Sequence, residues 1–275
     1  MSFVLSESSV YEPFNRILLV RQNALDEAIE VCCHGIANTC DLPYPVDALA
    51  LVRKTPPEAA SKQIEYAKTL ACTAQREMET GFGSIFEMAT VLLWGALETA
   101  VRDFVTLWLA KHPQARESDV LGRIKLRFAD FTSLSTEELH ESVVGQIERE
   151  TAAHLKKGMD RFDALLSAAR ISVPVEAALR QPLLALSEVS NVLVHKAGTV
   201  DRRLAQSCPW LELKERGTMR VSRDRYMKYN RSVGNYAACI PKTAPMGVES
   251  RKQQASNGRP EGQAVLPISR KGDTP

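Results

Sequence analysis

The sequence predicts an all-α fold, a bundle of successive helices. Apolar residues recur every three or four positions along most of the chain, and prolines and glycines separate these stretches where helices would end. With 275 residues, 44% hydrophobic and 25% charged, the chain has the composition of a globular protein with a sizeable core. Alternating apolar residues, which indicate strands, are confined to one short segment near the C-terminus.

Charge and hydrophobic patterning narrow the possible classes of protein. The net charge of +2 is too small to indicate nucleic-acid or membrane binding on its own. No apolar run approaches the roughly 18 to 20 residues that cross a bilayer, and the N-terminus does not show the pattern of a secretory signal. We therefore expect a cytoplasmic protein with no membrane partner, whose six cysteines are reduced.

Cys32, Cys33, His34 and Cys40 are the residues most suggestive of a metal site. Zinc sites, however, space two cysteines by about two to four residues and need a second pair of ligands. No such pair follows, and Cys32 lies on an apolar helical stripe, so we expect buried thiols. The sequence predicts no metal and no other cofactor.

The N-terminal half is predicted to contain three helices. The first covers residues 14–34, and a loop with two prolines follows at 39–46. The second begins at Thr55-Pro56-Pro57-Glu58, where Thr55 and Glu58 form a capping box, and runs to Gly81. The third, over 83–111, is the most apolar, and its predicted inward residues are Ile85, Ala89, Leu92, Ala96, Ala100, Phe104 and Leu107.

Further helices are predicted near 117–129, over 135–170 and over about 175–197. Ser135 and Glu138 form a second capping box at the start of the long helix. Alternating apolar residues on both sides of Gly217 predict a small β-hairpin. Ser222 then caps a last helix, and its stripe is assigned to the core rather than to base stacking: Tyr226, Tyr229, Val233, Tyr236 and Ile240. Residues 241–275 are predicted to be a disordered tail.

The stretch with recognisable chemistry is the end of the helix over 175–197. Glu188, Asn191 and His195 are three and four residues apart, so they form a polar row on one side of that helix. Histidine commonly acts as a general acid or base near neutral pH. Asn191 could orient its ring or hold a phosphate oxygen, and Glu188 could fix its tautomer. Glu98, within the apolar helix 83–111, is interpreted as part of a solvated face or as a carboxylate in a groove.

Residues 188–201, Glu-Val-Ser-Asn-Val-Leu-Val-His-Lys-Ala-Gly-Thr-Val-Asp, resemble the signature helix of the HEPN superfamily, the higher eukaryotes and prokaryotes nucleotide-binding domain. The family motif is an arginine, a polar residue, three variable residues and a histidine. Asn191 and His195 match their motif positions. The resemblance extends weakly over about residues 57–240, and it implies a HEPN-type helical bundle at 56–240, with an N-terminal helical extension at 1–55, a small hairpin insert and the tail.

The resemblance also implies function. Many HEPN proteins are metal-independent endoribonucleases of toxin–antitoxin, phage-defence and RNA-processing systems, and they commonly form homodimers through the motif helix. Here the position of the motif arginine holds Ser190, whose hydroxyl offers one donor and no charge. Lys196, Arg202 and Arg203, which follow the motif, are the candidate RNA-binding residues. Val192 and Val194 are predicted to lie off the core stripe, where they would supply dimer contacts.

Three interpretations therefore stand side by side. The first is a HEPN protein with a degenerate motif, formed by Ser190, Asn191 and His195 with Glu188, that binds RNA, nucleotide or a partner such as an antitoxin with little or no cleavage. The second is an active ribonuclease in which a nearby cation replaces the arginine. The third is a helical scaffold without catalysis.

Overall fold

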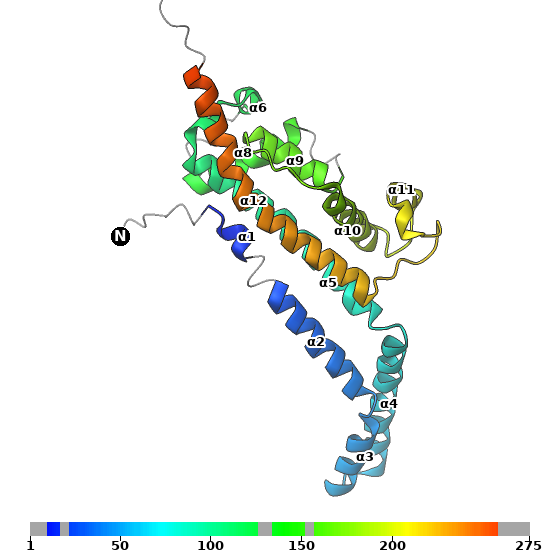
Figure 1. Cartoon of the computed structure of the whole chain (residues 1–275). Coiled ribbons are helices and arrows are strands. Elements are labelled where there is room, and N and C mark those ends of the chain that lie inside the picture. The colour runs from blue at the N-terminus through cyan, green and yellow to red at the C-terminus, as the bar shows by residue number, and fades with distance from the viewer. Residues whose placement is uncertain (1–9, 17–21, 126–133, 152–156, 258–275) are drawn as a thin grey trace, which may run out of the picture.

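The computed structural model describes residues 10–16, 22–125, 134–151 and 157–257. Within these residues the chain is all-α and contains no strand, which confirms the predicted fold class (Figure 1). The elements in chain order are α1 (Glu12–Arg16), α2 (Gln22–Thr39), α3 (Pro43–Val52), α4 (Pro57–Glu79), α5 (Gly83–Lys111), η3 (Pro113–Glu117), α6 (Asp119–Arg123), α8 (Thr136–Glu150), α9 (Met159–Ala168), α10 (Ala177–His195), α11 (Arg202–Ser207), η5 (Pro209–Leu211) and α12 (Arg223–Asn257).

Helix α5 is the central helix of the bundle, and its bounds agree with the prediction. Helices α1, α2, α8, α10 and α12 all pack against it. Leu93, Leu97 and Phe104 are buried, but Leu92, which was predicted to point inward, is 61% exposed. The prediction was wrong at Leu92 because α5 is apolar around most of its circumference, so the three–four spacing fits more than one stripe.

By length and composition, α5 is also apolar enough to cross a membrane. Half of its most apolar stretch is buried inside the structure, under the helices that surround it. A helix that is apolar on nearly every side is expected at the centre of a bundle. The position of α5 in the core therefore accounts for its composition.

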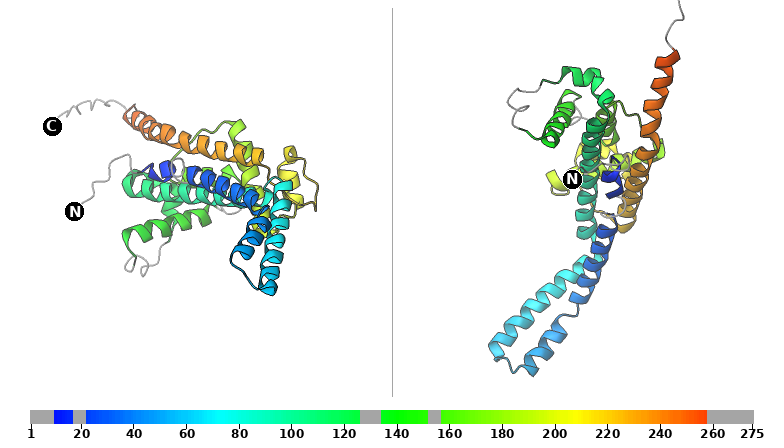
Figure 2. Two further views of the ribbon diagram at one scale, coloured as in Figure 1. Left: turned by 90° about the horizontal axis from the view of Figure 1, so that it is seen from below. Right: turned by 90° about the vertical axis from the view of Figure 1, so that its left-hand side faces the viewer.

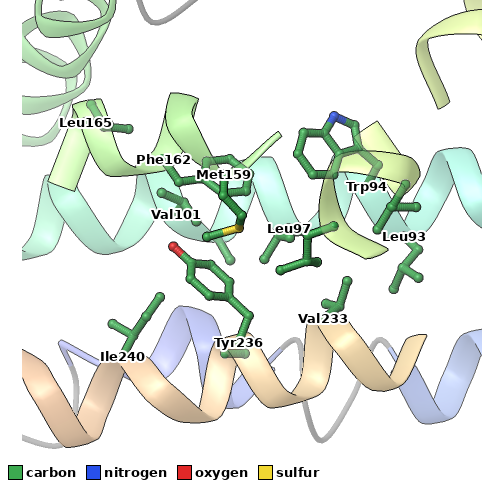
Figure 3. Packing of buried hydrophobic residues seen from close by; sticks show 14 of the residues in the cluster. Leu93, Trp94, Leu97, Val101, Met159, Phe162, Leu165, Val233, Tyr236 and Ile240 are labelled. Carbon is green, nitrogen blue, oxygen red and sulfur yellow. The ribbon is translucent and has the colours of Figure 1, made fainter. Parts of the chain in front are cut away.

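Helix α12 lies along α5 and contributes large aromatic side chains to the core (Figure 3). Figure 3 shows Tyr236 pointing from α12 toward Phe162 and Met159 of α9. The rings of Phe162 and Tyr236 stack with centroids 6.1 Å apart, and Trp94 stacks on Phe162 at 5.2 Å. Every residue of the predicted α12 stripe is buried, which confirms its assignment to the core.

Helices α3 and α4 form an arm that projects from the bundle (Figure 2). Helix α3 begins at Pro43, inside the segment that was predicted to be a loop. That prediction was wrong because a proline in the first turn of a helix loses no hydrogen bond. The predicted cap of α4 was also wrong: Pro56 is the N-cap and makes no side-chain cap bond, and Glu58 pairs with Lys62 instead.

Gly81 and Phe82 join the arm to the bundle. Both lie in the left-handed region, with φ of +68° and +60°. Beside this joint, α2 packs against both α4 and α5. Asp26 joins α2 to α12, because its carboxylate accepts hydrogen bonds from the hydroxyl of Tyr226 at 3.0 Å and from the amide of Asn230 at 3.0 and 3.1 Å.

The predicted helix over 135–170 is two helices, α8 and α9. Its capping box is confirmed, since Ser135 Oγ accepts from the backbone N–H of Glu138 and Glu138 accepts from that of Ser135. Gly158, with φ of +48°, starts α9. A Cβ at this position would lie 2.9 Å from the Cα of Leu184, so the glycine permits close contact between α9 and α10. The predicted helix near 117–129 is the short α6, and residues 126–133 lie outside the described part.

The predicted hairpin around Gly217 is not formed. Leu211 belongs to η5, and Thr218 pairs with Thr199 in a single antiparallel bridge. The segment after Gly217 therefore returns to the end of α10, where Met219 N–H donates to the carbonyl of Gly198 at 2.7 Å. Helix α12 continues to Asn257, past the predicted start of the tail, and residues 258–275 lie outside the described part.

Candidate functional site

The four residues predicted to carry the chemistry lie at the C-terminal end of α10. Glu188, Ser190, Asn191 and His195 all line one pocket of about 350 Å³, here called the α10 pocket. Its other lining residues come from α5 (Val91, Trp94, Gly95 and Glu98), from α9 and the residue two before it (Arg161 and Lys157), from α10 (Ser187 and Val194) and from α11 (Arg203). A volume of this size is typical of a small-ligand site.

The three predicted RNA-binding residues are placed differently. Arg203 lines the α10 pocket, whereas Lys196 and Arg202 are exposed and are not among its lining residues. Asp201 accepts a hydrogen bond from the backbone N–H of Leu204 at 2.8 Å and so starts α11 directly after the motif. Of the two consecutive arginines at the start of α11, only Arg203 lines the pocket.

Glu188 is buried, with 2% of its surface exposed, and it pairs with two of the basic side chains of the pocket. Its carboxylate makes a two-point ion pair with Arg203, at 3.2 Å from Nε and 3.3 Å from Nη2. Lys157 Nζ lies 4.0 Å from the same carboxylate and donates to Ser207 Oγ at 2.6 Å. The carboxylate that was predicted to fix the tautomer of His195 is therefore engaged by two cations instead.

Glu98 of α5 and Arg161 of α9 also line the pocket. They are an ion pair, and Arg161 also lies 3.6 Å from Glu148, which pairs with Arg102. Of the two interpretations of Glu98 given above, a solvated face or a carboxylate in a groove, the structure supports the carboxylate in a groove. Burial raises its pKa above the ordinary range, and the nearby Arg161 partly offsets that shift.

Lys157 and Arg161 were not predicted as site residues. Both come from the chain around the start of α9, far from the motif in sequence, and no spacing pattern connects them to it. They reach the pocket because Gly158 lets α9 pack closely on α10. The pocket thus contains three basic side chains, Lys157, Arg161 and Arg203, and two carboxylates, Glu98 and Glu188.

The remaining pocket residues differ in accessibility. Ser190 is buried, Asn191 is half-buried and His195 is exposed at the rim. A hydroxyl, an amide and an imidazole thus line a hollow with one apolar wall formed by Trp94 and Val91. Such an arrangement offers hydrogen-bond donors and cations to an anionic ligand.

The cysteines do not form a ligand set. Among the described residues, no group of three His, Cys, Asp or Glu side chains gathers in a geometry that could hold a metal ion. The expected burial of Cys32 was wrong: this thiol is exposed, and Cys33 and Cys40 are half-buried. Cys208 is the buried thiol, and its pKa is raised to about 11 by burial and by the nearby Glu188.

Comparison of the chain with protein-family models, curated proteins and solved structures gives no match. The structure itself defines the class: an all-α bundle with a mixed-charge pocket between α5, α9, α10 and α11.

Proposed function

We propose that this chain is a HEPN-like protein that binds RNA or a nucleotide phosphate in the α10 pocket, with little or no cleavage. The observation that carries the proposal is that Asn191 and His195, the two residues matching the HEPN motif, share one pocket with Arg203. Guanidinium groups bind phosphate through charge-assisted hydrogen bonds. The resemblance also supports a role in toxin–antitoxin or phage-defence systems, with an antitoxin or another protein as partner.

We expect weak cleavage because Ser190 occupies the position of the motif arginine. Loss of one preorganised donor at a developing oxyanion typically lowers the rate about 100- to 1,000-fold, and a charged two-point contact should matter at least as much. Arg203 and Arg161 are held by Glu188 and Glu98, so neither is free to act as the missing arginine without breaking an ion pair.

The test is RNA binding and cleavage by the purified chain in excess EDTA. We expect binding that weakens steeply as salt rises, because phosphate contacts release counterions, and no cleavage that depends on His195. Arg203→Gln should weaken binding, and Arg202→Gln, on the neighbouring residue outside the pocket, is the matched control. Undetectable binding at low salt would leave only a helical scaffold.

An active metal-independent ribonuclease is the second candidate, and Lys157 favours it, because its ammonium lies 4.0 Å from Glu188 and not in a close ion pair. In that case RNA is cleaved in EDTA, His195→Ala abolishes cleavage, and Ser190→Arg raises it. Because Ser190 is buried, the circular dichroism spectrum of Ser190→Arg must match that of the unmodified chain before its activity is compared.

We also propose a homodimer that forms beside the pocket. Val194 on α10 and Met88 and Leu92 on α5 are exposed apolar residues, and Val194 lines the pocket itself. Val192, the other residue predicted to supply dimer contacts, is buried in the core, so that prediction was wrong. Light scattering at micromolar concentration should give the mass of a dimer, and Val194→Asp should convert it to the mass of a monomer.

A further inference from the structure

A second hollow of about 620 Å³ lies next to the α10 pocket, along the N-terminal half of α10. We call it the Trp210 groove. Its lining residues are Lys157, Met159, Asp160, Ala177, Ala178, Arg180, Gln181, Leu184 and Trp210. Lys157 lines both hollows, so they adjoin at this side chain.

Trp210 is the tryptophan whose ring is accessible. It is 38% exposed, whereas Trp94 and Trp108 are 7% and 3% exposed in the core. Its backbone is held in η5, where the N–H of Leu211 donates to the carbonyl of Cys208 at 3.0 Å, and Cys208 is buried. An accessible indole on a fixed backbone is suited to stacking on a flat ligand ring.

Four of the other lining residues are small or apolar. They are Ala177, Ala178 and Leu184 of α10 and Met159 of α9. Gly158 permits the close contact of α9 with Leu184. The groove therefore combines an accessible indole and small, apolar residues with polar and charged side chains.

The charges of the groove distinguish Lys157 from Arg180. Arg180 is paired with two carboxylates, Asp160 at 3.4 Å and Asp163 at 2.6 Å. Lys157 donates to a neutral hydroxyl and shares the single carboxylate of Glu188 with Arg203, whose contacts are shorter. Among the described residues Lys157 Nζ makes no ion pair shorter than 4.0 Å, so it is the basic side chain of the groove that can add a contact to a phosphate.

We propose that the Trp210 groove is a subsite for a base of single-stranded RNA, stacked on Trp210, while the adjoining phosphate contacts Lys157. This inference rests on the proposed function, and it adds the direction in which the strand leaves the α10 pocket. A cationic path beside an aromatic ring is how single strands are held without sequence readout.

The experiment compares two probes, a short single-stranded RNA and inorganic phosphate, on the full chain. Base stacking on an aromatic ring contributes about 1–3 kcal/mol, so Trp210→Ala should weaken RNA binding about 5- to 150-fold and leave phosphate binding unchanged. Trp210→Phe keeps a ring and should retain most of the RNA affinity. Lys157→Gln should weaken the binding of both probes and lower the salt dependence by about one phosphate contact.

Two controls separate the possible outcomes. Tyr66 is an exposed aromatic residue of the arm, so Tyr66→Ala should change neither affinity. RNA should quench tryptophan fluorescence in the unmodified chain and much less in Trp210→Phe. If RNA binds and Trp210→Ala has no effect, the base subsite is wrong and the proposed function survives. If RNA does not bind at low salt, both fail.

Discussion

At the scale of single residues, two buried tyrosines of α12 differ in whether the hydroxyl has a hydrogen-bond partner. Tyr226 and Tyr229 are both fully buried, but only the hydroxyl of Tyr226 donates to Asp26. The hydroxyl of Tyr229 has no hydrogen-bond partner among the described residues. Burial raises the pKa of both phenols, so each stays protonated at neutral pH.

Tyr226→Phe and Tyr229→Phe therefore form a matched pair. A hydrogen bond to a charged acceptor contributes about 1.5–3 kcal/mol, so Tyr226→Phe should lower the free energy of unfolding by that amount. Tyr229→Phe removes a buried group without a partner and should leave the free energy of unfolding unchanged or slightly higher. Urea unfolding of the two variants tests this, and equal losses would contradict it.

Glu98 should give stability a defined dependence on pH. Its pKa is raised mainly by burial, so the folded protein binds this proton more tightly than the unfolded chain. Its contribution to stability is thus fully present below the ordinary pKa of 4.5 and decreases as the pH rises toward the folded-state pKa. Glu98→Gln cannot ionise, so the stability of the unmodified chain minus that of the variant should fall over this range. Urea unfolding at a series of pH values measures this difference, and a difference that does not change with pH would argue against the prediction.

At the scale of helices, much of the fold could be predicted from the sequence. The bounds of α5 and α10 agree because each is a long apolar stretch with a clear stop signal. The core stripe of α12 agrees because its apolar residues keep the three–four spacing. Helix α3 was missed because a proline-rich segment can start a helix as well as interrupt one. The hairpin was wrong because alternation over a few residues does not specify which segment is the partner.

The site residues also divide into those that could be predicted from the sequence and those that could not. Glu188, Asn191 and His195 share one pocket because their three–four spacing places them on one side of the helix. Ser190 lines the same pocket although it lies outside that row. Lys157 and Arg161 could not be predicted, since their approach depends on how α9 packs on α10. Unlike helical periodicity, the packing of one helix on another cannot be recognised from the spacing of residues in a short stretch of sequence.

The confirmed capping box gives a prediction for α8. Ser135→Ala removes the oxygen that accepts from the N–H of Glu138, and loss of an N-cap side chain typically lowers stability by about 1 kcal/mol. Ser167→Ala, at an exposed position inside α9, removes a hydroxyl that caps no helix and should change stability by less than about 0.5 kcal/mol. Thermal unfolding compares the two, and an unchanged Tm for Ser135→Ala would contradict the capping role.

At the scale of the whole molecule, burial is uneven. The bundle around α5 is densely packed, whereas in the arm only Ala50, Ala67 and Ala74 are buried (Figure 2). Segments with few buried apolar contacts open most readily. We expect hydrogen exchange to be fastest in α3 and the first half of α4 and slowest in α5, and comparable protection in α3 and α5 would contradict this.

Asp26 has a consequence for how the arm is attached. Helix α2 packs against α4 of the arm and against α5, and Asp26 also joins it to α12 through the hydrogen bonds from Tyr226 and Asn230. Replacing this one carboxylate would leave α2 held by packing alone, so the arm would lose the polar part of its anchorage to the bundle.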